Sequence, residues 1–287
     1  MTQAQISQEG VETVTQLSTK VVRKVTADEL AAYRDVVRSG LSASDGNPSP
    51  LHAFVLASPV IDESVGMIGA ASADGSPLGR VHLSQEIHVR RAIKADEPVT
   101  VALNVTGARR SAKGVQVGMK VALIGEDGEE FAQLVTGAML VGAATPDTFG
   151  ELPPYPGKNS TAEPTVVSRS IARETVTKYA YASGDLNPIH LEDDAAKEAG
   201  FAGGVIAHGM SVLALVTEEV IDRYAGGDAA KVRSVGARFS AAVSPDTPLE
   251  IVLQQDEQFV RFSCKTPTGP ALKSGWVELA QNTDPAE

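Results

Sequence analysis

The chain has 287 residues, of which 43% are hydrophobic and 21% charged, so it is long enough for two domains and has the composition of a soluble globular protein. Its 36 acidic and 25 basic residues give a net charge of −11, which disfavours general attraction to nucleic acid or to an anionic membrane. A single cysteine, Cys264, excludes an internal disulfide, and the polar N-terminus and lack of a long apolar run predict a cytoplasmic protein without a membrane span.

The first predicted elements are two helices. Thr26 and Glu29 have the spacing of a capping box ahead of the apolar stripe that begins at Leu30, which predicts a short amphipathic helix. The apolar run that follows His52 predicts a core helix. Strands rich in Val, Ile, Leu and Thr are then expected at about 81–91, 98–106, 114–124 and 131–142.

A change of composition marks the middle of the chain. Residues 146–164 contain Pro153, Pro154 and Pro156 among turn-forming residues, which is typical of a linker. We therefore expect an N-terminal domain over residues 1–145, a linker over 146–164 and a C-terminal domain over 165–287.

The second half repeats the order of the first. Helices are expected near 174–182, 192–199 and 209–223, followed by strands near 231–243, 248–255, 258–266 and 271–280. Helices first and a sheet afterwards, twice, predicts an α+β protein. Residues 92–103 also match residues 242–253 at an offset of 150, with alanine, aspartate, proline and the closing leucine in common, which favours a duplicated domain.

The segment with the richest chemistry lies between the first two helices of the second half. Residues 179–190 read Tyr-Ala-Tyr-Ala-Ser-Gly-Asp-Leu-Asn-Pro-Ile-His, so the acid Asp185 and the base His190 stand five positions apart on a turn. Eighteen residues later, His208 and Gly209 open an apolar stretch with helical spacing. A helix N-terminus with free backbone N–H groups is therefore expected near the pair.

This pattern, with Ala196, Gly200-Phe201 and residues 207–210 after it, resembles the MaoC-like family of (R)-specific enoyl-thioester hydratases and 3-hydroxyacyl-thioester dehydratases, over about residues 165–280. The resemblance implies a tandem hot-dog fold, in which a curved antiparallel sheet wraps a long helix in each domain. It also implies a hydro-lyase of fatty acid metabolism, which reversibly adds water to trans-2-enoyl thioesters to give (3R)-hydroxyacyl thioesters. Asp185 and His190 match the family's catalytic pair. No cofactor is implied, because coenzyme A or an acyl carrier protein carries the substrate.

The expected reaction assigns roles to the motif residues. Asp185 and His190 would hold a water, with one group taking its proton and the other protonating C2, which requires Asp185 to be partly desolvated. The backbone N–H of Gly209 would stabilise the thioester oxygen. Supporting hydrogen bonds or substrate contacts are expected from Ser183, Gly184, Asn187 and His208.

Other kinds of site fit the motif less well. A calcium loop starting at Asp185 would need an oxygen ligand where Ile189 stands and glycine where His190 stands. A zinc site at His190 and His208 lacks a third ligand at helical or hairpin spacing, so no metal is expected. Residues 200–204 do not have the spacing of a dinucleotide fingerprint. A hot-dog acyl thioesterase and a non-catalytic acyl-thioester binding or scaffold protein remain as alternative functions.

The first half contains only a partial copy of the motif. Asp45 and His52 are seven residues apart instead of five, and His52 leads directly into the core helix. We interpret His52 as the counterpart of His208 and the first domain as non-catalytic, which resembles two-domain family members whose inactive half widens the acyl tunnel. One active site per chain is therefore expected, in a monomer of paired hot-dogs or a homodimer.

Two basic clusters stand out on this acidic chain. One contains Arg90, Arg91 and Lys94, and the other lies at residues 109–113. Either could contact the phosphates of coenzyme A or an acidic carrier protein, although such clusters are more often solvated strand ends.

Overall fold

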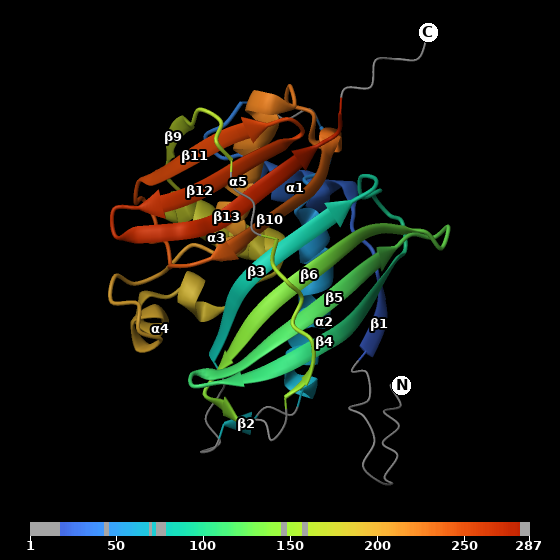
Figure 1. Ribbon diagram of the computed structural model, residues 1–287, viewed down its shortest axis with the longest axis vertical. Helices are drawn as coiled ribbons and strands as arrows, with labels where there is room; N and C mark the ends of the chain where they lie inside the picture. The colour runs from blue at the N-terminus through green and yellow to red at the C-terminus, as the bar shows by residue number, and fades with distance from the viewer. Residues whose placement is uncertain are drawn as a thin grey trace.

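A computed structural model describes residues 18–42, 46–68, 71–72, 79–144, 148–156 and 160–281 of the protein. Figure 1 shows two curved sheets that meet edge to edge, each with a long helix against one face. The N-terminal half contains, in chain order, β1 (Ser18–Arg23), α1 (Ala27–Val37), α2 (His52–Met67), β2 (Ala71–Ser72), β3 (Gly79–Val89), β4 (Val99–Ser111), β5 (Gly114–Ile124), β6 (Glu130–Val141), β7 (Ala143–Ala144) and β8 (Phe149–Gly150).

The C-terminal half repeats the order of one strand, two long helices and four strands, with an additional short helix and, among the described residues, without counterparts of β2, β7 and β8. Its elements are β9 (Thr165–Arg169), α3 (Arg173–Ser183), the 3-10 turn η1 (Pro188–His190), α4 (Asp193–Glu198), α5 (Gly209–Tyr224), the 3-10 turn η2 (Ala229–Lys231), β10 (Val232–Phe239), β11 (Leu249–Asp256), β12 (Phe259–Thr266) and β13 (Gly269–Leu279).

Pairing of β3 with β10 joins the two sheets into one continuous antiparallel sheet of eleven strands. Its order is β1-β4-β5-β6-β3-β10-β13-β12-β11-β9, with β8 beside β4. The α+β class is confirmed, and every helix and strand predicted from the sequence lies within a few residues of its expected place. The edge strands β1 and β9 were not predicted. Among the described residues, no helix combines the length and the apolar character that a membrane span needs.

Local sequence explains how the main helices form. The side chain of Thr26 accepts the backbone N–H of Glu29 at 3.2 Å, and the Glu29 carboxylate accepts the Thr26 N–H at 2.8 Å, which is the predicted capping box. Helix α5 is buried on all sides from Met210 to Ile221, because the curved sheet wraps it. The core of the C-terminal half is therefore centred on α5.

The two halves are related by a twofold axis between β3 and β10. Glu86 pairs with Gly236, its own counterpart at the 150-residue offset, so the axis passes between these two residues. Asp96 and Asp246, also 150 residues apart, both adopt a left-handed conformation, with φ of 60° and 59°. The Asp96 N–H donates to the carbonyl oxygen of Val25 and the Asp246 N–H to that of Ile171, each at 2.8 Å and each in the connection between the first strand and the first helix of its own half. The short sequence match is therefore a true structural repeat.

A buried ion-pair network joins the halves. On α1, Arg34 lies 3.3 Å and Arg38 lies 2.8 Å from the carboxylate of Glu218 on α5, and Arg38 also pairs with Asp222 at 2.7 Å. Glu218 is completely buried, so its charge depends on these two guanidinium groups. The network fixes α1 of one half against the core helix of the other.

The segment between the halves is packed rather than loose. Gly107, Gly118 and Gly137 are register partners on β4, β5 and β6, so side chains are missing along a row across the sheet. The chain of residues 148–156 lies over Gly107 and Gly118 of this row, with Glu151 against Gly107 and Pro153 in the space that a side chain at Gly118 would fill (Figure 1). The domain boundaries expected from the sequence remain a prediction, but this part of the expected linker is a strap across the sheet.

Candidate active site

The motif loop is held by a series of hydrogen bonds between residues close in the sequence. Helix α3 ends at Gly184, which adopts a left-handed conformation with φ of 76°. The Asp185 N–H then donates to Ser183 Oγ, the Asn187 N–H to Asp185 Oδ1 and the Ile189 N–H to Asn187 Oδ1, each at 3.3 Å. Asx-type and Ser-type turns of this kind fix a loop backbone without regular secondary structure. One oxygen of Asp185 is thereby occupied and Oδ2 is left for other partners.

His190 lies at the end of this loop and is buried. Its Nδ1 donates to the carbonyl oxygen of Ile206 at 2.8 Å, so Nδ1 carries the proton in the neutral ring and Nε2 has a free lone pair. Burial lowers the pKa of His190 below its usual value, and the Ile206 carbonyl and the charge of Asp185 act in the opposite direction. The neutral ring is therefore a base near neutral pH.

His208 connects the loop to the start of α5. Its Nε2 donates to the Asp185 carbonyl oxygen at 3.0 Å, and its ring stacks on His190 with the ring centroids 3.7 Å apart. Burial, followed by the neighbouring His190, lowers the pKa of His208 to about 4. His208 therefore stays neutral and holds Asp185, His190 and the helix terminus in one arrangement.

Gly209 is the first residue of α5, and no side chain caps this helix N-terminus. Gly209 is exposed between the buried His208 and Met210, so its backbone remains accessible. A Cβ atom at this position would lie 2.9 Å from Cδ1 of Phe239, which shows how closely that ring covers the glycine. Sequence reasoning placed the helix start correctly but did not identify Phe239 as its neighbour.

Asp185 is partly exposed. Its side chain is 52% exposed, because the residues from Gly184 to Pro188 project from the body of the protein and are all exposed. The desolvation expected from the sequence remains a prediction, and a bound substrate would add to it.

Asp185, His190 and His208 offer ligand atoms within 4.8 Å of one another, so the structure supplies the third metal donor that the sequence spacing did not show. Ring orientation nevertheless disfavours a shared ion. The two imidazoles are stacked at an interplanar angle of only 25°, and their in-plane lone pairs cannot converge on one metal. The His208 Nε2 atom is also already used as a donor. This set fits proton transfer better than metal binding.

The N-terminal half retains part of the same arrangement. Tyr33 packs against His52 with ring centroids 5.0 Å apart, as Tyr179 packs against His208 at 4.8 Å, and the two tyrosine hydroxyls are 3.5 Å apart. His52 thus has the environment expected of a counterpart of His208. Asp45 lies outside the described residues.

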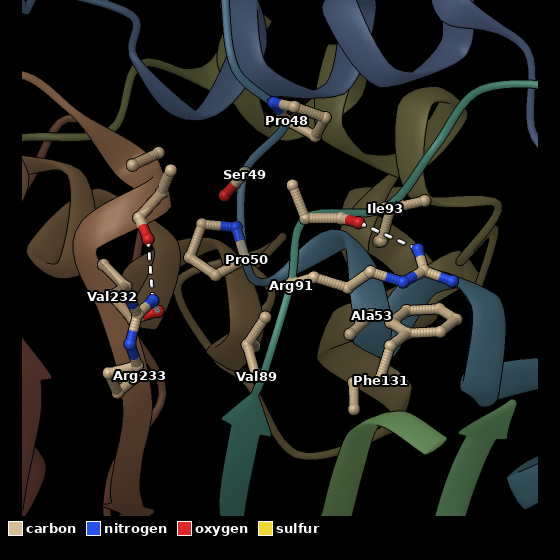
Figure 2. Close-up of a pocket in the computed structure, with 14 residues that line it drawn as sticks. Pro48, Ser49, Pro50, Ala53, Val89, Arg91, Ile93, Phe131, Val232 and Arg233 are labelled. Carbon is tan, nitrogen blue, oxygen red and sulfur yellow. Dashed lines mark hydrogen bonds between the residues drawn. The ribbon is translucent and has the colours of Figure 1, made fainter. Parts of the chain in front are cut away.

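A small cavity occupies the corresponding place in the N-terminal half (Figure 2). It is lined by Ala53, Val89 and Val232 among others, and its volume of about 20 Å³ has room for roughly one water molecule. None of the C-terminal motif residues, 179–190, 208 and 209, lines this cavity. Arg91 borders the cavity, pairs with Glu97 at 2.7 and 3.0 Å and stacks over Phe131.

The basic cluster near residue 90 is therefore partly committed to internal pairs. Arg90 approaches Glu130 at 3.5 Å, and Lys94 is exposed. A role of Arg90, Arg91 and Lys94 in phosphate binding remains a prediction.

Known proteins resemble both the sequence and the fold. A family model described as MaoC like domain matches residues 157–270. The chain is 28% identical over 210 residues to 3-hydroxyacyl-thioester dehydratase X of Mycobacterium tuberculosis, which covers 70% of this chain and 71% of that protein. It spans only 13% and 4% of two longer curated relatives.

Two solved structures show the fold. A MaoC-like dehydratase from Phytophthora capsici matches with a TM-score of 0.77 at 19% identity, over 94% of this chain and 97% of the other. A Mycobacterium tuberculosis protein described as having a double hot-dog fold matches with a TM-score of 0.61 at 11% identity, over 94% and 96% of the two chains. The tandem hot-dog fold expected from the sequence is confirmed.

Proposed function

The C-terminal half of this chain belongs to the MaoC-like dehydratase family, and from this premise we propose that the protein is a hydro-lyase that reversibly adds water to trans-2-enoyl thioesters to give (3R)-hydroxyacyl thioesters. One observation carries the proposal. The Asp185 carboxylate and the neutral His190 ring lie with His208 in a cluster whose polar atoms are within 4.8 Å of one another, beside the uncapped N-terminus of α5. These are the groups that water addition to an activated double bond needs.

The protonation of the pair suggests the order of events. A water held between Asp185 Oδ2 and His190 Nε2 loses a proton to one of them as its oxygen bonds to C3. Electron density moves through C2 to the thioester oxygen, where the Gly209 N–H stabilises the developing charge. The proton then passes to C2, and the neutral 3-hydroxyacyl thioester leaves.

This order refines the roles expected from the sequence. Asp185 carries a carboxylate and His190 is bare at Nε2, so neither group holds a spare proton for C2 before water is activated. The proton taken from the water is therefore the one delivered to C2. Oxygen and proton then add to the same face of the double bond.

The proposal is tested with purified protein and two substrates, crotonyl-CoA and a longer trans-2-enoyl-CoA. We expect the ultraviolet absorbance of the enoyl thioester to fall without release of free thiol. Thiol release at a matching rate would indicate a thioesterase, and binding of both substrates without any absorbance change would indicate a binding protein. Either of these results would reject the hydro-lyase.

Variants of the pair give the second part of the test. Asp185→Asn and His190→Gln should each lower kcat by about 10²–10⁴-fold, the usual contribution of a positioned acid or base. Asp194→Asn is a matched control, because Asp194 is an exposed carboxylate on the following helix, 3.6 Å from Lys197. Its kcat should stay within about twofold of the wild type.

The carrier and the assembly are also proposals. Acyl-CoA and acyl carrier protein thioesters are both candidate substrates, and kcat/KM measured with the same acyl group on each carrier would separate them. A cytoplasmic location, and either a monomer or a homodimer of paired hot-dogs, remain predictions from the sequence.

A further inference from the structure

His82, on β3 of the N-terminal half, lies in an aromatic stack that reaches the active site of the other half. Its ring is stacked on Phe54 of α2, with centroids 5.3 Å apart at 20°, and contacts Phe239 of β10 at 4.5 Å and 42°. Phe239 in turn lies directly over Gly209, the first residue of α5. The stack therefore extends from the N-terminal half to the proposed oxyanion donor.

The ring of His82 is held in one orientation. Gln85 donates its amide N–H groups to the carbonyl oxygens of Glu86 at 2.8 Å and Val135 at 3.3 Å, which fixes Gln85 Oε1 as an acceptor. Oε1 accepts the Thr136 hydroxyl at 2.9 Å and lies 3.2 Å from His82 Nε2. Nε2 therefore carries the proton of the neutral ring. These hydrogen bonds restrict rotation of the His82 ring.

The charges of the site act on this ring. Burial lowers the pKa of His82 to about 4, while the Gln85 hydrogen bond and the negative charge of Asp185 act in the opposite direction. His82 is thus neutral at physiological pH and lies within the electrostatic reach of the proposed catalytic carboxylate.

The twofold relation between the halves gives an internal comparison. His82 lies four residues before Glu86 on the axis, as Val232 lies four residues before Gly236. The same relation pairs Phe239 with Val89, and because His52 is the counterpart of His208, Ala53 is the counterpart of Gly209. Val232, Val89 and Ala53 all line the cavity of about 20 Å³ in the N-terminal half (Figure 2).

Each half therefore contributes one side chain, His82 or Val232, to an equivalent position near the core helix of the other half. In the N-terminal half this residue is Val232, beside a cavity too small for an acyl group. In the C-terminal half it is His82, which contacts Phe239, the ring that covers Gly209, and which feels the charge of Asp185. The halves meet where β3 pairs with β10, so the contact of each of these residues with the other half follows from the register of the sheet.

We propose that His82 is a specificity-determining residue of the acyl pocket, where its ring, held between Phe54 and Phe239, forms the wall against which the acyl carbons beyond C3 pack. This inference rests on the proposed function. A flat, fixed wall admits an unbranched acyl chain and rejects a branch close to the double bond. The non-catalytic half thus selects the substrate that the other half converts.

The test compares kcat/KM for crotonyl-CoA and for 4-methylpent-2-enoyl-CoA, which is branched next to C3. His82→Ala should shift the ratio toward the branched substrate by about tenfold, the usual effect of opening an apolar pocket by a few carbons. His82→Phe keeps a ring in the stack and should leave the ratio within about threefold of the wild type. Val232→Ala, at the equivalent position of the other half, is the matched control and should not change it.

An unchanged ratio in a folded His82→Ala protein, as judged by Tm and circular dichroism, would overturn the inference while leaving hydration by the wild type intact. A wild type that hydrates neither substrate would instead reject the proposed function. In that case the inference is judged by calorimetric binding of butyryl-CoA and 4-methylpentanoyl-CoA. His82→Ala should then bind the branched thioester about tenfold more tightly relative to the straight one, and equal ratios in both proteins would refute it.

Discussion

The two halves of the molecule share a fold but differ in one loop. Tyr33 is separated from His52 by 18 residues, whereas 28 residues separate Tyr179 from His208. The ten additional residues allow the C-terminal half to form η1 and α4, which present Asp185 and His190 beside α5. The N-terminal half keeps the tyrosine and the histidine but not this loop. Repetition of a fold need not repeat its chemistry, and in the proposed function the chemistry depends on this short insertion.

Substitutions at equivalent residues near the starts of α5 and α2 should give the largest difference between the halves, in their effect on kcat. Gly209→Ala would push a Cβ against Phe239, displace the start of α5 and lower kcat by about 10²-fold, the effect expected of a displacement near 1 Å. Ala53→Gly, the equivalent change in the N-terminal half, should leave kcat unchanged. Steady-state kinetics with crotonyl-CoA check both variants, and equal losses would contradict a single active half.

Stability should also respond unequally at equivalent positions of the two core helices. Glu218→Gln removes the buried carboxylate that Arg34 and Arg38 share, although Arg38 keeps its pair with Asp222, so the free energy of unfolding should fall by about 3–5 kcal/mol. Asp62 is the counterpart of Glu218, but its pair with Arg80 is exposed, so Asp62→Asn should cost less than about 1 kcal/mol. Urea unfolding measures both values, and similar losses would show that the network does not join the halves.

The pH dependence of stability should reveal the buried histidines in both halves. Burial lowers the pKa of His52 and of His208 to about 4. Between pH 6.5 and 4 the unfolded chain binds protons that the folded chain does not, so stability is complete above pH 6.5 and falls as the pH drops. Each group contributes up to about 3 kcal/mol. In His52→Phe, Tm measured against pH should fall less steeply than in the wild type, and an unchanged slope would refute the assignment.

The strap of residues 148–156 gives the smallest expected effect. Gly118→Val would occupy the space of Pro153, so the strap must move and unfolding should become easier by about 1–3 kcal/mol. Gly79→Ala is the control, because its nearest neighbour, Val141, would lie at an ordinary contact distance of 3.5 Å. Thermal unfolding of both variants checks this, and an unaffected Gly118→Val protein would indicate a loose linker.

The sequence predicted the long helices, the central strands and the motif loop, because their signals are local. It did not reveal β1 and β9, whose residues are mostly exposed and are stabilised by pairing with β4 and β11. The strap has the proline content of a linker. Its packing depends on the space left by glycines on distant strands, which local composition does not show.

The site was predictable only in part. The pairing of Asp185 with His190 follows from their spacing, but the exposure of Asp185 depends on how far the loop projects. His82 carries no local signal at all. Only the register between β3 and β10 brings it to the other half.

On the proposed function, each chain has a single active site in its C-terminal half. The hydration rate of crotonyl-CoA with Asp185→Asn, in which Asp45 is intact, tests this. We expect activity to be lost to background, with binding of butyryl-CoA retained. Substantial residual activity that a further Asp45→Asn change abolishes would contradict it, because the N-terminal half would then be a second catalytic site.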